Sequence, residues 1–367
     1  MLIKIDRQYN NPLVTAYLDG DYESFKNLID TGANINCMSN TGESLICMVV
    51  RHLSSINRDL NKKFFDLLIN NDVHLGRICS SNSPLELSFK NNETNYYMEK
   101  ILKKITEINY FERYEEGEFD NSNPNPNLFK LLSVGYLKKI KLYLDYNPDL
   151  KVKNIDGVPV LNYLILNDNN GQVYRYAINL FLEKGADPNQ TDNQHRSFLH
   201  YMAIKFHDKK LFDLSIEKGA CVNAVDESGA TPLMYASSAD HCDFMKLAIE
   251  NGSIINQQDH FGKTAVIYAA HQFRYYALKC LDNCDCDFSI QDNNGDNFAH
   301  HILSNISFNK INDFMEFFVK YSDQMKVKNN AGESPLDIMK FKNPKIYSKF
   351  CKMCDQKEST KNLENLN

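Results

Sequence analysis

Four segments of the chain repeat one another at a nearly constant spacing. They are DNQHRSFLHYMA (192–203), DESGATPLMYAS (226–237), DHFGKTAVIYAA (259–270) and DNNGDNFAHHIL (292–303). Their leading aspartates are spaced 226 − 192 = 34, 259 − 226 = 33 and 292 − 259 = 33 residues apart. A fixed period of this size indicates a solenoid, in which each repeat packs on its neighbours. Such an array is a surface for holding a partner and requires no catalytic residue.

Each repeat carries the local signals of a helix pair. Thr231 stands where it can cap a first helix, and Pro232 falls in the first turn, where a missing N–H costs nothing. The second helix, FMKLAIENG (244–252), ends at Gly252, because glycine adopts the left-handed conformation cheaply. The same ending recurs as EKGADPN (183–189), EKGACVN (217–223) and DTGANIN (30–36). The expected fold class is therefore all-α, a solenoid of helix-turn-helix units with extended or β-turn connections.

The period and the D-x-x-G-x-T-P-L-H-type opening resemble the ankyrin repeat family. The resemblance covers most of residues 7–352 and accommodates roughly ten units. We expect diverged N-terminal repeats over 1–92, an insertion or hinge over 93–124, a repeat array over 125–354 and a disordered polar tail over 355–367. Shorter polar inserts are expected at 54–62 and 167–172.

Composition excludes several classes of protein. The formal net charge of −6 argues against a nucleic-acid-binding protein, which normally has a basic excess. The sequence contains no window of 18 apolar residues, so no membrane span is predicted. The start MLIKIDRQYNNP is too polar for a signal peptide. The ten cysteines are scattered among apolar positions, as expected of buried free thiols in a reducing compartment. We therefore expect a cytoplasmic monomer.

Three patterns that could carry chemistry are better explained by the repeats. Gly262-Lys263-Thr264 lacks the earlier glycine of a phosphate-binding loop, because Gln257 stands there. The Cys351-x-x-Cys354 pair and Cys284-x-Cys286 lie too far apart along the array to complete one zinc site. His200 and His300 match the family's TPLH histidine, which the resemblance assigns to hydrogen bonding within and between repeats. No catalytic residue, metal ligand or cofactor is predicted.

The resemblance implies a partner-binding concave face formed by turn tips and first-helix ends. By position, its candidate residues are Asn193, Gln194, Arg196, Glu227, Ser228, Ala230, His260, Phe261, Lys263, Asn293, Asn294 and Asp296, joined by Ser238, His271 and Gln272. His195 occupies a glycine position, which predicts an altered or strained turn. Phe261 is an aromatic residue at a turn tip, where it either faces solvent until a partner covers it or packs on the neighbouring turn.

The function expected is a non-catalytic scaffold that binds a protein partner. The diverged, insert-bearing repeats resemble ankyrin proteins of intracellular bacteria and of large DNA viruses. The tail KESTKNLENLN is similar to the C-terminal signals of bacterial effectors secreted into host cells, and such an effector is the context expected. A viral host-range or adaptor protein and an endogenous adaptor are the alternatives. An enzyme with a catalytic region in residues 1–130 is a further alternative, because the repeats are poorest there.

Overall fold

The computed structural model describes residues 11–39, 42–52, 58–71, 73, 87–88, 96–107, 128–129, 131–132, 137–146, 148–167, 173–205, 208–305 and 308–364. In these residues the regular elements are helices, and an antiparallel bridge joins Met38 and Ser44. The all-α fold class expected from the sequence is thus confirmed. The chain divides into two compact units, residues 1–156 with 170–184 and residues 157–169 with 185–367, which are described separately.

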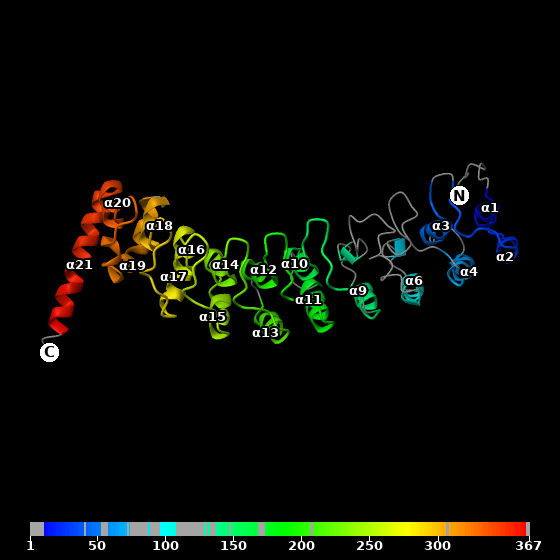
Figure 1. Cartoon of the computed structure of the whole chain (residues 1–367), viewed down its shortest axis with the longest axis horizontal. Helices are drawn as coiled ribbons and strands as arrows, with labels where there is room; N and C mark the ends of the chain where they lie inside the picture. Colours follow the sequence, from blue (N-terminus) through cyan, green and yellow to red (C-terminus); the bar gives the residue numbers. More distant parts are fainter. Residues whose placement is uncertain are drawn as a thin grey trace. The chain divides into compact units, whose positions relative to one another are not determined.

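The second unit is a succession of paired helices. Its first helices pack in chain order, each on the next, and so do the second helices α13, α15 and α17 (Figure 1). The first helices are α10 (Val160–Leu166), α12 (Phe198–Ile204), α14 (Pro232–Ala239), α16 (Ala265–His271), α18 (Phe298–Asn305) and α20 (Pro335–Lys342). The others are α13 (Lys209–Glu217), α15 (Cys242–Glu250), α17 (Tyr275–Asp282), η2 (Phe308–Phe314), α19 (Met315–Lys320), η3 (Gln324–Lys326) and α21 (Pro344–Glu364).

The helix boundaries follow the capping residues of the sequence. The hydroxyl of Thr231 accepts a hydrogen bond from the Met234 N–H at 3.4 Å, and Pro232 begins α14. Thr264 caps α16 in the same way, through the Ile267 N–H. Gly252 follows α15 with a φ of 87°, a conformation that glycine adopts without strain. The predicted start and end signals are therefore confirmed.

The described part of the first unit is also helical. Its helices are α1 (Pro12–Asp19), α2 (Tyr22–Asp30), α3 (Leu45–Arg51), α4 (Arg58–Ile69), α6 (Tyr96–Glu107), α9 (Leu137–Leu144) and α11 (Val173–Glu183). Phe64 of α4 meets Phe25 and Tyr17 edge-on, with ring centroids 4.8 and 5.2 Å away. The buried amide of Asn61 accepts from the Tyr17 hydroxyl and donates to the Val49 carbonyl. Aromatic contacts and one polar network thus hold α1, α2, α3 and α4 together.

Three expected boundaries differ from the structure. The insert expected at 54–62 is helical from Arg58, where α4 begins. The segment 93–124 contains α6, which packs on α4 with Met98 and Ile101 fully buried, so this part belongs to the core; residues 108–124 lie outside the described part. The tail expected to be disordered from Asp355 continues α21 to Glu364. There Lys357 Nζ donates to the Val319 and Lys320 carbonyls at the end of α19.

None of the described helices combines the length and apolar character needed to cross a membrane.

Candidate functional site

Each regular repeat of the second unit opens with a turn built around one carboxylate. Asp226 Oδ1 accepts hydrogen bonds from the N–H groups of Ser228 and Ala230 at 2.8 and 2.9 Å. Its other oxygen, Oδ2, accepts from the Tyr235 hydroxyl at 2.8 Å. The side chain therefore closes the turn and ties it to the helix that follows.

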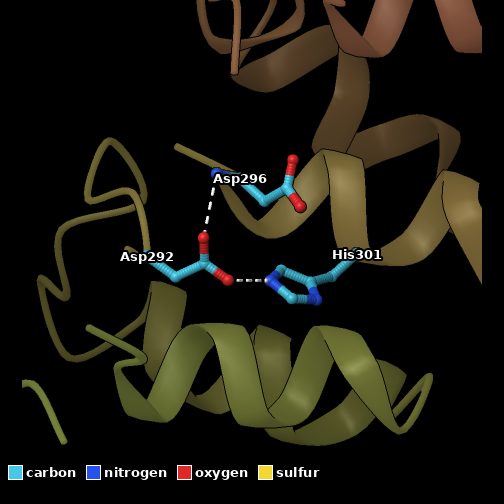
Figure 2. Close-up of side chains that lie close together, drawn as sticks. All are labelled: Asp292, Asp296 and His301. Atoms are coloured by element: carbon cyan, nitrogen blue, oxygen red, sulfur yellow. Dashed lines mark hydrogen bonds and ion pairs between the residues drawn. The ribbon is translucent and has the colours of Figure 1, made fainter. Parts of the chain in front are cut away.

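The arrangement recurs in three further repeats. Asp192 pairs with Tyr201 at 2.5 Å and Asp259 with Tyr268 at 2.8 Å, each through Oδ2. In the fourth repeat a histidine replaces the tyrosine, and His301 Nε2 lies 2.9 Å from Asp292 Oδ2 (Figure 2). The leading aspartates are evident in the sequence, whereas the partner nine residues later was not predicted, although its spacing is constant.

Hydrogen bonding stabilises the charged form of Asp226 and Asp192. Burial by itself raises the pKa of Asp226, but the hydrogen bonds from Ser228, Tyr235 and Ala230 outweigh it and lower the pKa below its usual value. The pKa of Asp192 is lowered in the same way. Burial and the neighbouring carboxylate raise the pKa of Tyr235, which stays a hydrogen-bond donor. The carboxylate and the phenol therefore keep their roles across the neutral range.

Neighbouring turns are joined through their backbones. Glu227 N–H donates to the Gln194 carbonyl, and His260 N–H donates to the Ser228 carbonyl, both at 2.9 Å. Asn293 N–H donates to the Phe261 carbonyl at 3.0 Å, and Asn330 N–H to the Asn294 carbonyl at 2.9 Å. The turn tips of the second unit therefore form one continuous strip with a defined spacing.

Close contact between the turns explains their glycines. A Cβ on Gly262 would lie 2.8 Å from the Asn293 backbone nitrogen, and its φ is 77°. Gly229 is in the same situation against His260. His195 adopts a φ of 60° at the corresponding place, which a non-glycine residue occupies only with strain. The strained turn predicted at His195 is thus present.

The structure exposes most of the predicted partner-binding residues. The exposed ones are Asn193, Gln194, Glu227, His260, Phe261, His271, Gln272, Asn293 and Asn294. Those of intermediate exposure are Arg196, Ser228, Ser238, Lys263 and Asp296. Ala230 is buried, with 1% of its surface exposed, and cannot contact a partner. Its N–H and carbonyl instead serve the turn and the preceding repeat.

Some of these residues have structural roles that position alone did not reveal. Arg196 donates to Asp192 Oδ2 through Nε and to the Tyr201 hydroxyl through Nη2, both at 2.8 Å. Asp296 accepts from the Asn329 amide at 2.7 Å. Phe261, in contrast, is 59% exposed, so its ring projects largely into solvent from a fixed backbone.

Basic side chains cap the ends of the first helices, a feature that sequence reasoning missed. Each donates to a carbonyl at the end of the preceding repeat's first helix: Lys205 to Leu166, His241 to Ile204, Arg274 to Ser238 and Lys342 to Ser304. The charged groups of Lys205, Arg274 and Lys342 also offset the negative end of the helix dipole. The corresponding sequence signal is a basic residue eight or ten positions after the helix N-cap. The spacings are 205 − 197 = 8, 342 − 334 = 8, 241 − 231 = 10 and 274 − 264 = 10.

The histidines matched to the TPLH motif are structural. The Ser197 N–H donates to His200 Nδ1 at 3.1 Å, so the proton is on Nε2, which lies 3.0 Å from the Ala230 carbonyl in the next repeat. His300 bridges Asn297 and Glu333 in the same manner. Thr264 of the GKT tripeptide is the N-cap of α16.

In the described part of the first unit, a shallow hollow of about 360 Å³ lies beside α1 and α2. Asp21, which lines this hollow, is the N-cap of α2.

A family model and a curated relative both identify ankyrin repeats in this chain. The family model for ankyrin repeats, which describes three copies, matches residues 128–259 and 199–281. An ankyrin repeat protein of Acanthamoeba polyphaga mimivirus is 23% identical over 377 residues, covering 93% of this chain and 46% of that protein. The chain thus spans about half the length of that curated relative. The solved ankyrin repeat domain of Bcl-3, of the IκB protein family, gives a TM-score of 0.46 at 16% identity, over 58% of this chain and 89% of that domain.

Proposed function

This chain contains ankyrin repeats, which are protein–protein interaction modules, and we propose that it is a non-catalytic scaffold whose partner binds the turn tips of the second unit. The observation that carries this proposal is the exposed row of Gln194, Glu227, Phe261 and Asn294 on turns fixed by backbone hydrogen bonds. A preorganised surface loses little conformational entropy on binding. Phe261 is the expected anchor, because aromatic residues are enriched in the core of interfaces and a few side chains carry most of the binding energy.

Basic and polar groups flank Phe261 on this surface. Lys263 is half-buried beside the tip, and His271 and Gln272 are exposed at the end of α16. The neighbouring tips supply the amides of Asn293 and Asn294 on one side and the carboxylate of Glu227 on the other. A partner segment with an apolar side chain for Phe261 and acidic or amide groups for Lys263 matches this arrangement.

The experiment compares partner capture by the wild type and by the Phe261→Ala, Lys263→Glu double variant. We expect the variant to lose capture while its thermal midpoint stays nearly unchanged, because neither side chain closes a turn. Tyr276→Ala is the matched control, since Tyr276 is 68% exposed but lies on the second helix α17. Undiminished capture by the double variant, or equal loss in the control, would contradict the proposal.

The biological setting of the interaction is a separate question. The mimivirus relative favours a viral protein that acts on host factors over an effector secreted by an intracellular bacterium. In either setting the chain acts in the cytoplasm as a monomer that binds a host protein, and an endogenous adaptor would bind a protein of its own source. Proximity labelling in the source cell and, separately, in a host lysate distinguishes these settings by where the Phe261-dependent partner is found.

A further inference from the structure

The repeat that begins at Asp292 differs from the three repeats before it at two positions, four and nine residues after its leading aspartate. Nine residues after that aspartate, the other three repeats have tyrosines, namely Tyr201, Tyr235 and Tyr268, whereas this one has His301. Four residues after it, the others have Arg196, Ala230 and Lys263, whereas this one has Asp296. Only here, among these four repeats, do two carboxylates and an imidazole meet.

The three side chains converge from the turn and from α18. His301 Nε2 lies 2.9 Å from Asp292 Oδ2, and the potential donor atoms of Asp292, Asp296 and His301 all lie within 4.8 Å of one another (Figure 2). Asp292 and His301 are 6% and 9% exposed, so the cluster is largely shielded from water. We propose that these three residues bind a divalent metal ion of the zinc class.

The donor types suit such an ion. Zinc is bound by imidazole nitrogen and carboxylate oxygen at about 2.0–2.2 Å, which places ligand atoms about 3.3 Å apart in a tetrahedron. Asp292 Oδ2 and His301 Nε2 are 2.9 Å apart, so an ion bound between them would widen this pair by about 0.4 Å. The half-buried Asp296 carboxylate, which accepts from the Asn329 amide, has a ligand atom within 4.8 Å of both and would rotate toward the ion. Asp292 Oδ1 keeps its hydrogen bonds to the turn, so Oδ2 alone is needed as a ligand. The imidazole becomes a ligand when its proton moves from Nε2 to Nδ1.

A second histidine borders the cluster from the preceding repeat. The ring centroids of His271 and His301 are 5.6 Å apart with an interplanar angle of 77°. Two imidazoles on one tetrahedral zinc ion have centroids about 5 Å apart, given the same bond lengths. His271 is exposed at the end of α16 and can turn toward the ion as its fourth ligand. The ion would then join the adjacent helices α16 and α18.

The surrounding charges are compatible with a cation. Burial lowers the pKa of His301 even though the Asp292 carboxylate raises it, and burial together with Lys263 lowers that of His271. Burial thus favours the neutral imidazole at both rings, and the neutral imidazole is the form that binds metal. The Lys263 ammonium opposes a cation here, but its single charge is set against two carboxylates.

The test uses the full chain, stripped with a chelator under reducing conditions and titrated with ZnCl₂ and CoCl₂. His301→Tyr is the decisive variant, because it restores the aspartate–tyrosine pair of the neighbouring repeats and so preserves the fold. Asp296→Ala has its counterpart in Ala230 and provides a second variant should the first be unstable. Circular dichroism checks the folding of both.

We expect the wild type to bind one zinc ion that raises its thermal midpoint, with both variants weakening binding more than about 100-fold, since loss of even an outer-shell partner costs 10–100-fold. The cobalt form should show visible d–d absorption without sulfur-to-metal charge transfer. Absence of binding, unchanged affinity in a folded variant, or a thiolate signal that a Cys284→Ser, Cys286→Ser variant removes would overturn the proposal.

Discussion

Removing the Tyr235 hydroxyl should weaken one repeat in a way that depends on Asp226. Asp226 accepts four hydrogen bonds, from the Ser228 N–H and hydroxyl, the Ala230 N–H and the Tyr235 hydroxyl, at 2.8, 2.7, 2.9 and 2.8 Å. A hydrogen bond to a charged group contributes about 1.5–3 kcal/mol. Because Tyr235 is half-buried, we expect Tyr235→Phe to cost about 1.5 kcal/mol, at the lower end of this range.

Asp226→Ala should cost more, because it leaves several donors without their acceptor. The two turn N–H groups and the Tyr235 hydroxyl all lose their charged acceptor. We therefore expect the free energy of unfolding to fall by about 3–4 kcal/mol. In the Asp226→Ala background, Tyr235→Phe should then have little further effect. The double-mutant cycle should therefore give a coupling energy of about 1–2 kcal/mol.

The assay combines urea denaturation with amide hydrogen exchange. Repeat arrays open locally, so exchange at the Ser228 and Ala230 amides reports this repeat more directly than the global midpoint. Tyr276→Phe, at an exposed ring, is the control. A cost below about 0.5 kcal/mol for Tyr235→Phe, or additive effects in the cycle, would refute the reasoning.

The charge state of Asp226 adds a pH dependence to the same interaction. Its folded pKa is lowered below the unfolded value of about 3.9, so its stabilisation is present above that pH and is lost as the pH falls through the folded pKa. The acid limb of the stability curve should be shallower in Asp226→Asn. Identical acid limbs would show that this carboxylate is not the titrating group.

Two further predictions concern the turns and the buried histidine. Gly262→Ala should destabilise the protein by about 2 kcal/mol or more, because the left-handed backbone and the contact with Asn293 both oppose a Cβ. Gly252→Ala, with a similar φ but nothing within 4 Å, should cost only the backbone strain, so equal midpoints in urea would contradict the account. Burial lowers the pKa of His200, so the stability it contributes is complete above its unfolded pKa of about 6.5 and is lost as the pH falls below it. His200→Gln should lack this loss between about pH 6.5 and 5, and a wild-type curve of the same shape in that range would disprove the assignment.

Helix ends were predictable because their signals are local. Thr231, Pro232 and Gly252 act through their own backbone conformation, and the structure places each where the sequence indicated. The tail was predicted wrongly because only its local polarity was considered. Asp355 and the residues after it are polar, but Lys357 anchors the helix to the end of α19. A contact across 38 positions leaves no local signal.

The candidate site was predictable in outline only. Counting positions found the exposed tips, including Phe261, because a repeat places equivalent residues on the same face. It could not separate Arg196, which is bound by Asp192 and Tyr201, from a free partner-binding side chain. Nor did it identify the shared role of Tyr268 and His301, because the constant spacing of nine residues acquires a meaning only when each side chain reaches Oδ2 of its own repeat's aspartate.

The sequence by itself determined the repeat, its helix pairs and the face on which the tips lie, because period, caps and glycines are properties of short segments. The tertiary structure decided which polar side chains are used internally and which remain free for a partner. Hydrogen bonds between one turn and the next, and between aspartates and residues nine positions later, form only when the helices pack. Exposure and charge environment follow from that packing, as the contrast between exposed Phe261 and buried Asp292 shows.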